Sequence, residues 1–275
     1  MLFPLYDLNP HRRFPWLTLA IIAINVAVTG WMSTLSQRDQ AELALRYRFI
    51  PQRLSQMGKV QAIEAPLLAA DPLTGQPKQF GKLLLSTAPS DVYPTFLTTM
   101  FLHGGWLHLI TNMWMLWIFG NNIEDRLGHL IFVAFYLLGG LLATICYWAS
   151  DPNGLLPVVG ASGAVAAVLG GYAVTYPTAK VRTLIFLVII TIIDLPALVV
   201  LGIWFALQVF SGVLGLWGVV LEPVAFWAHV GGFVAGIVLM PLLSLGASPP
   251  GTDWRKESDE MFRFDDPRSI KEKLN

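Results

Sequence analysis

The chain has 275 residues, of which 55% are hydrophobic and 13% are charged, and its formal net charge is zero. A soluble domain carries roughly 25% charged residues, so this composition excludes an ordinary soluble domain and indicates a polytopic protein of the lipid bilayer. The neutral balance gives no indication of a nucleic-acid partner. A single cysteine, Cys146, excludes an internal disulfide.

Apolar windows of about 20 residues predict the membrane spans. Residues 1–14 form a polar arm, and the first span follows over 15–32. Its apolar run lacks a small-residue cleavage site, so we expect an anchor and no cleaved signal peptide. A long first loop covers 33–94. The other predicted segments are spans at about 95–120, 130–148, 162–176, 196–216 and 224–245, a tight polar loop at 121–129, and a polar tail at 246–275.

The number of spans depends on residues 183–221, which are almost wholly apolar and could cross the membrane once or twice. With six spans, the short inner loops hold Arg126, Lys180 and Arg182, and the short outer loops hold no Lys or Arg. This distribution follows the positive-inside rule. We therefore expect an all-α bundle of six transmembrane helices over 15–245, with both termini cytoplasmic and 183–194 as an apolar connection at the inner face.

A serine stands between small residues at the head of the fourth span, in Gly160-Ala161-Ser162-Gly163. The plain interpretation is that small residues let membrane helices approach closely, with Ser162 adding an interhelical hydrogen bond. The alternative is that Ser162 is a nucleophile. A nucleophilic serine needs a base within hydrogen-bond reach.

His229 is the candidate base. It precedes Gly232 and Gly236 at i+3 and i+7, on one face of a helix. Two faces of small residues can pack closely, and only six spans start both helices from the same side. His229 could instead be a structural residue bonded to a carbonyl, although an intramembrane histidine indicates function by default. The facing stripe consists of Ser162, Ala166 and Gly170.

The second span offers candidate oxyanion donors. His108 and Asn112 lie four residues apart on one helix face, and both can donate hydrogen bonds to a developing negative charge. Their alternative role is to bind neighbouring helices. His103 points elsewhere on a regular helix and is interpreted as structural. We expect no metal and no cofactor, because the weak alternative of zinc on His103, His108 and His229 lacks an H-E-x-x-H pattern.

Two further charged groups are interpreted as structural. Glu124 and Arg126 are predicted to form a local charge pair that caps helix ends in the 121–129 loop. No aspartate is placed beside His229 within the membrane. Ser162 and His229 are therefore expected to work as a dyad.

These motifs together resemble the rhomboid family of intramembrane serine proteases, in its bacterial form. The resemblance covers the whole membrane region and depends on the order of the motifs. The matching segments are Asn9-Pro10 through Pro15, His103 through Asn112, Glu124-Asp125-Arg126, Gly160 through Gly163, and Ala228 through Gly236.

The resemblance implies a six-helix bundle with a water-filled cavity open to the outer side. It implies Ser162 as nucleophile and His229 as general base, with the oxyanion held by the Ser162 N–H, His108 and Asn112. Substrates would be transmembrane helices, cut near small residues. A bacterial inner membrane is the expected location, and no oligomeric state is implied.

The chain departs from the family at two points. Ala166 stands where many relatives carry a larger residue that packs on the base, so His229 is expected to be held less firmly. The first loop, 33–94, is longer than in compact members. Two other functions stay open at this point: a non-catalytic rhomboid-like protein that binds transmembrane helices, and an unrelated transporter, for which we see no convincing internal repeat.

Overall fold

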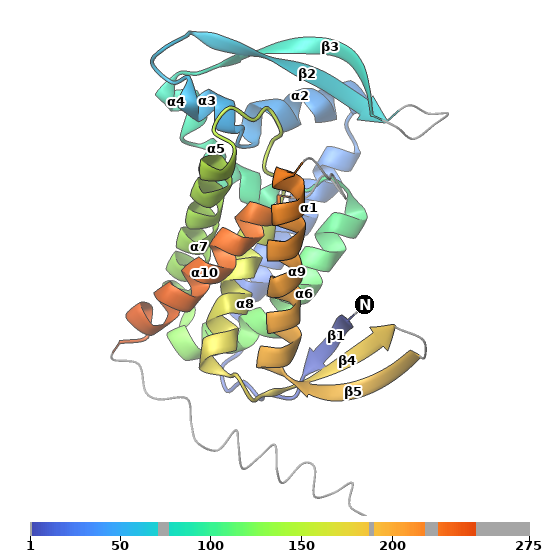
Figure 1. Cartoon of the computed structure of the whole chain (residues 1–275), viewed down its shortest axis with the longest axis vertical. Coiled ribbons are helices and arrows are strands. Elements are labelled where there is room, and N and C mark those ends of the chain that lie inside the picture. The colour runs from blue at the N-terminus through green and yellow to red at the C-terminus, as the bar shows by residue number, and fades with distance from the viewer. Residues whose placement is uncertain (1, 71–76, 187–189, 218–224, 246–275) are drawn as a thin grey trace, which may run out of the picture.

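The computed structural model describes residues 2–70, 77–186, 190–217 and 225–245 (Figure 1). The predicted tail at 246–275 lies outside the described residues, as does the predicted start of the last span at 224. Long helices form a bundle at the centre of the molecule. These helices are α1 (Trp16–Ser33), α6 (Trp106–Leu127), α7 (His129–Ser150), α8 (Ser162–Thr175), α9 (Ala197–Leu216) and α10 (Phe226–Leu243).

The helix composition identifies an integral membrane protein. Four segments are long and apolar enough to cross a bilayer: Trp16–Ser33, His129–Ser150, Ala197–Gly215 and Phe226–Leu243. The apolar helix α8 has only 14 residues, which corresponds to about 21 Å against a hydrocarbon core of about 30 Å. The predicted first, third, fifth and last spans therefore lie close to the observed helices.

The prediction for the second span is wrong at both ends. Residues 95–101 form the short helix α5 (Thr95–Thr98) and the 3₁₀ turn η1 (Thr99–Phe101), and α6 begins only at Trp106. At the other end, α6 runs through the predicted loop to Leu127. Gly128 alone separates α6 from α7, with a φ of 77° that favours glycine.

The expectation of an all-α chain is also wrong. Strands β1 (Leu2–Asp7), β4 (Lys180–Phe186) and β5 (Ile190–Pro196) form a three-stranded antiparallel sheet in the order β1-β4-β5, at one end of the bundle (Figure 1). The apolar connection predicted at 183–194 is thus a hairpin. Pairing satisfies backbone groups that irregular structure would leave open near hydrocarbon.

A charge pair closes the same hairpin. Arg182 donates from Nε and Nη2 to the two carboxylate oxygens of Asp194, at 2.7 and 2.9 Å. The Arg182 hydrogen bond lowers the pKa of Asp194 below its usual value. Both carboxylate oxygens of Asp194 are therefore bonded within the sheet.

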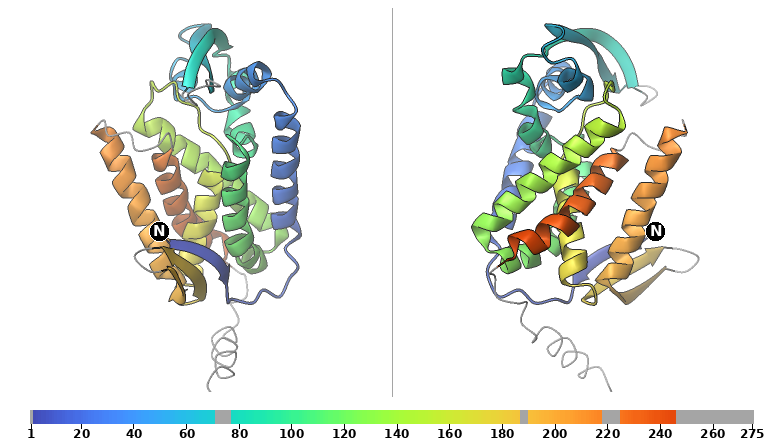
Figure 2. Two further views of the ribbon diagram at one scale, coloured as in Figure 1. Left: turned by 90° about the vertical axis from the view of Figure 1, so that its right-hand side faces the viewer. Right: turned by 60° about the vertical axis from the view of Figure 1, so that its left-hand side comes forward.

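The long connection is a folded cap, which we define as residues 37–92. It contains α2 (Gln37–Tyr47), α3 (Pro51–Ser55), the antiparallel pair β2 (Ala62–Ala70) and β3 (Pro77–Ser86), and α4 (Pro89–Val92). The cap lies at the end of the bundle opposite the sheet (Figures 1 and 2). Alternate residues of β2 are buried with residues of α2 and β3 and with the residue that precedes α3, in a small core of their own. This core consists of Leu45, Ile50, Ile63, Ala65, Leu67 and Leu85.

Polar groups join the sheet to helices α6 and α8. Asp7 Oδ2 accepts hydrogen bonds from Tyr172 Oη at 2.8 Å and from Asn122 Nδ2 at 2.7 Å. These contacts satisfy polar side chains in the stretch of α6 that was predicted to be a loop, so the helix can continue there. Burial raises the pKa of the Asp7 carboxyl to about 7, against an opposing effect of the Tyr172 hydrogen bond.

We expect Asp7 to make stability depend on pH. Its folded pKa of about 7 lies above the ordinary value of 3.8, so the folded state binds the proton more tightly. The contribution of Asp7 to stability therefore rises as pH falls through about 7 and is complete only below the ordinary pKa of 3.8. Asp7→Asn removes this titration. Thermal unfolding in detergent should show a weaker rise in melting temperature toward low pH for Asp7→Asn than for the native chain. Equal pH dependence of the two proteins would contradict this assignment.

Candidate active site

Ser162 and His229 meet where two helices begin. Ser162 is the first residue of α8, and His229 lies in the first turn of α10. His229 Nε2 is 2.8 Å from Ser162 Oγ, and both residues are partly exposed. The structure therefore brings together the two residues that the sequence analysis proposed as nucleophile and base.

Close backbone packing sets this distance. A Cβ atom on Gly232 would lie 2.1 Å from the carbonyl oxygen of Gly163 and 3.2 Å from Ala166 Cβ. One turn further on, a Cβ on Gly236 would lie 1.9 Å from the Ala167 oxygen. The glycine face of α10 thus touches the backbone of α8, which places the His229 ring at the level of Ser162.

The turn before Ser162 needs a glycine. Gly160 has a φ of 85°, and a Cβ there would lie 2.9 Å from His108 Cε1 and 3.1 Å from His103 Cδ2. The turn leads directly into α8, whose first N–H groups have no acceptor within the helix. Together with the helix dipole, they form a region suited to negative charge.

The two candidate oxyanion donors lie on α6 and differ in their contacts. The His108 ring lies beside the Gly160 turn. The centroids of the His108 and His103 rings are 5.3 Å apart. Asn112 is buried, and its Nδ2 donates to the His108 carbonyl oxygen at 2.7 Å. One amide hydrogen of Asn112 is therefore used within α6, and the second is left for another acceptor.

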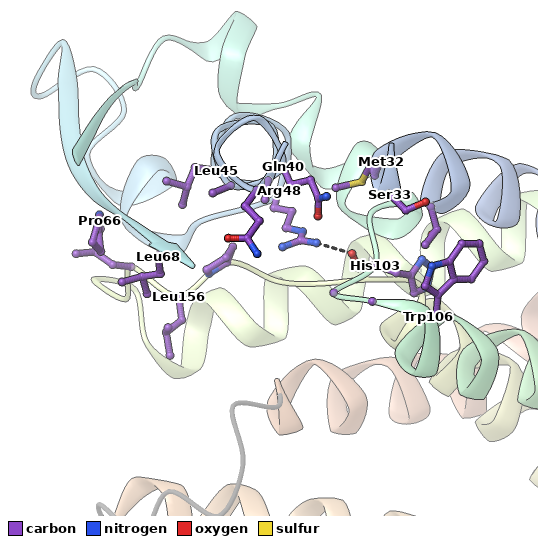
Figure 3. A pocket seen from close by; sticks show the side chains of 18 residues that line it. Met32, Ser33, Gln40, Leu45, Arg48, Pro66, Leu68, His103, Trp106 and Leu156 are labelled. Atoms are coloured by element: carbon purple, nitrogen blue, oxygen red, sulfur yellow. Dashed lines mark hydrogen bonds between the residues drawn. The ribbon is translucent and has the colours of Figure 1, made fainter. Parts of the chain in front are cut away.

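His103 joins the turn, α6 and the cap. Its Nε2 accepts from the Ala161 N–H at 3.4 Å, and its carbonyl oxygen accepts from Arg48 Nη2 at 2.7 Å. Figure 3 shows this contact in a pocket of about 570 Å³ between the cap and the start of α6. Burial lowers the pKa of Arg48 to about 10, so the guanidinium stays charged at neutral pH and holds the His103 segment in place.

Glu124 and Arg126 lie in the last two turns of α6, far along the helix from His108. The buried Glu124 carboxylate accepts from the N–H groups of Leu17 and Thr18, at 3.0 and 2.8 Å, and contacts His129 Nδ1 at 2.5 Å. It thus caps the first turn of α1, more than 100 positions earlier in the chain. The structure does not bring Glu124 and Arg126 to Ser162.

The sequence analysis missed two residues that contact the candidate base. Gln208 Oε1 lies 2.7 Å from His229 Nδ1, and the Trp204 ring lies 5.8 Å from the imidazole at an interplanar angle of 33°. Both come from α9. The available signal was that Gln208 is the only carboxamide in the segment 197–216, whose other residues are apolar apart from Ser211.

Within the described ranges, no group of three or more His, Cys, Asp or Glu side chains is arranged to hold a metal ion. The side chains that meet at the candidate site are the Ser162 hydroxyl and the His229 imidazole. The fold and the site thus define a helical membrane protein with a serine–histidine pair at helix N-termini. The family model of the rhomboid domain matches residues 90–246, and the chain belongs to the rhomboid family.

Three curated relatives show the extent of the similarity. The chain is 33% identical over 139 residues to presenilin-associated rhomboid-like protein A, mitochondrial, of Danio rerio, covering 50% of this chain and 34% of the relative. It is 32% identical over 151 residues to rhomboid-like protein 11, chloroplastic, of Arabidopsis thaliana, covering 54% and 52%. RHOMBOID-like protein 4 of the same plant is 29% identical over 241 residues, covering 82% and 52%. The chain thus spans about half or less of the length of these relatives.

Proposed function

We propose that the chain is an intramembrane serine endopeptidase that cleaves transmembrane helices of membrane proteins. The observation that carries the proposal is the 2.8 Å contact between Ser162 Oγ and His229 Nε2. Family membership supports it, because this contact lies within the matched domain at residues 90–246. A hydroxyl and an imidazole in contact at the start of two apolar helices are the parts that nucleophilic catalysis requires.

In the proposed mechanism, Ser162 Oγ attacks the scissile carbonyl carbon while His229 Nε2 takes the hydroxyl proton. The carbonyl oxygen becomes an oxyanion. When the tetrahedral intermediate collapses, the C–N bond breaks and His229 gives the proton to the leaving amine. A water molecule then attacks the acyl ester by the same route, which releases a carboxylic acid and regenerates the Ser162 hydroxyl.

The oxyanion is proposed to bind the Ser162 N–H together with His108 and Asn112. The free N–H groups at the start of α8 support the first contact, and the place of the His108 ring beside Gly160 supports the second. The remaining amide hydrogen of Asn112 supports the third. This geometry is held by residues with a structural role, namely His103, Gly160, Gly163, Gly232 and Gly236.

We expect His108→Ala and Asn112→Ala to slow catalysis without abolishing it. Removing one oxyanion donor from a soluble protease costs roughly 10²–10³ in turnover, and here two donors stay in place. Each variant should bind a helix substrate nearly as well as the native chain and react more slowly with a fluorophosphonate. Labelling rates in detergent measure this effect. Native rates in both variants would show that neither side chain binds the oxyanion.

We further propose that six helices, α1 and α6 to α10, cross the membrane, with the cap outside and both termini inside. Contact between the first turns of α8 and α10 supports an odd number of crossings between the end of α8 and the start of α10, and α9 is the one long helix described there. The domain division into a 1–14 arm, a 15–245 membrane domain and a 246–275 tail belongs to this proposal. A reporter fused after residue 245 that reads outside would contradict it.

A second function is a rhomboid-like protein that binds transmembrane helices without cutting them. The experiment that separates the two is reconstitution in liposomes with a panel of helix substrates that contain small residues near the outer face. The native chain should cut at least one of them, and Ser162→Ala should cut none. Equal cleavage by both proteins, or by neither across the panel, would overturn the proposed protease. The expected bacterial inner membrane stays a prediction, since the relatives above include proteins named as mitochondrial and chloroplastic.

A further inference from the structure

Helix α9 supplies two side chains to His229 from outside the predicted dyad. Gln208 Oε1 lies 2.7 Å from His229 Nδ1. The Trp204 ring, one helical turn earlier, lies beside the His229 imidazole with 5.8 Å between the ring centroids. Residues four apart share a helix face, so one face of α9 contacts both a nitrogen and the plane of the imidazole. Figure 2 shows α9 at the edge of the bundle, beside α8 and α10.

We propose that Gln208 is a positioning residue that fixes the tautomer and orientation of His229. This inference rests on the proposed function, in which His229 is the base. A neutral imidazole carries one N–H. When that N–H is on Nδ1, it donates to Gln208 Oε1, and Nε2 keeps the lone pair that accepts the Ser162 proton. The opposite tautomer would place a hydrogen on Nε2, where a base needs a lone pair.

The packing of α8 explains why α9 has this task. Ala166, one turn after Ser162, is fully buried, and a Cβ on Gly232 would lie 3.2 Å from its Cβ. The alanine methyl group is too small to cover the His229 ring from the side of α8. Besides Ser162, the side chains that the structure places against His229 are Gln208 and Trp204 of α9.

A carboxamide also suits the surroundings better than a carboxylate. A charged side chain within a transmembrane segment is expensive, whereas a hydrogen-bonded neutral amide costs much less. Gln208 is the only carboxamide in α9. A glutamine facing lipid would leave its polar groups without partners, so its contact with Nδ1 accounts for its presence in this helix.

The test compares Gln208→Leu with the native chain and with Leu207→Ala. Leu207 is the neighbouring residue, and it is 56% exposed and turned away from the bundle. Outer partners that fix histidine tautomers at metal sites contribute about 10–100-fold, so Gln208→Leu should lower kcat by roughly 10-fold or more with little change in KM. Leu207→Ala should keep native kcat. Thermal unfolding in detergent shows whether each variant is folded.

Two further measurements separate positioning from packing. The ¹⁵N shifts of His229, assigned with a His229→Gln variant, should show the Nδ1–H tautomer in the native chain and a shift toward Nε2–H in Gln208→Leu. Gln208→Glu keeps an acceptor at this position, so it should restore most of the lost kcat and add one titration to the pH–rate profile. The ¹⁵N shifts do not depend on cleavage. A native chain without activity would therefore overturn the proposed protease function, while the tautomer of His229 could still be measured. Unchanged shifts in Gln208→Leu, or a native kcat, would overturn the positioning role.

Discussion

Ser162→Ala and His229→Ala should each abolish cleavage, and the double variant should be hardly slower than either single variant. The two side chains are 2.8 Å apart, and each is useless as nucleophile or base without the other. Residues that act as one unit give strongly non-additive losses, and a single loss in a soluble serine protease reaches about 10⁶-fold in kcat. We expect at least about 10⁴-fold here, measured as initial cleavage rates of one reconstituted helix substrate.

Matched substitutions control for general damage to the fold. Ser150→Ala removes a serine at the end of α7 whose hydroxyl donates to the Tyr147 carbonyl, and His11→Ala removes an exposed histidine of the N-terminal arm. Both should keep nearly native cleavage. Losses for Ser162→Ala and His229→Ala that multiply in the double variant would show that the two residues act independently.

Gly236→Ala should destabilise the folded protein strongly, whereas Gly202→Ala should not. A Cβ at Gly236 would lie 1.9 Å from the carbonyl oxygen of Ala167, and a backbone atom cannot move aside without moving α8. Overpacking typically costs 1–3 kcal/mol, and we expect roughly 3 kcal/mol here because the clash is with backbone. Nothing lies within 4 Å of a Cβ at Gly202 in α9, where alanine should be neutral or slightly stabilising.

The same pair of variants links packing to activity. If α10 is displaced from α8, the His229 ring leaves Ser162, so Gly236→Ala should lose cleavage even below its melting temperature. Thermal unfolding and initial rates in the same detergent measure both effects. A Gly236→Ala protein that melts with the native chain would contradict the close approach of the two helices.

The sequence was sufficient for features that depend on local patterns. Long apolar windows predicted α1, α7, α9 and α10 to within a few residues, because hydrocarbon requires continuous helices. The small-residue stripes that begin at Ser162 and His229 indicated which helix faces meet, because glycine is the residue that permits contact between helix backbones.

Features that depend on distant partners could not be predicted in this way. The polar stretch at the end of α6 reads as a loop until Asp7 and the first turn of α1 are known to satisfy it. The edge strand β1 pairs with β4. More than 170 positions of the chain separate the last residue of β1 from the first residue of β4. Gln208 lies 21 residues from His229 on another helix, so neither periodicity nor spacing connects the two.

The residue that a fluorophosphonate modifies identifies the nucleophile of this protein. The native chain in detergent is treated with the probe, digested and mapped by mass spectrometry, beside Ser162→Ala and His229→Ala. We expect one adduct, on Ser162, that is lost in Ser162→Ala and nearly absent in His229→Ala. An adduct on another residue, or native labelling of Ser162 without His229, would contradict a serine nucleophile activated by that histidine.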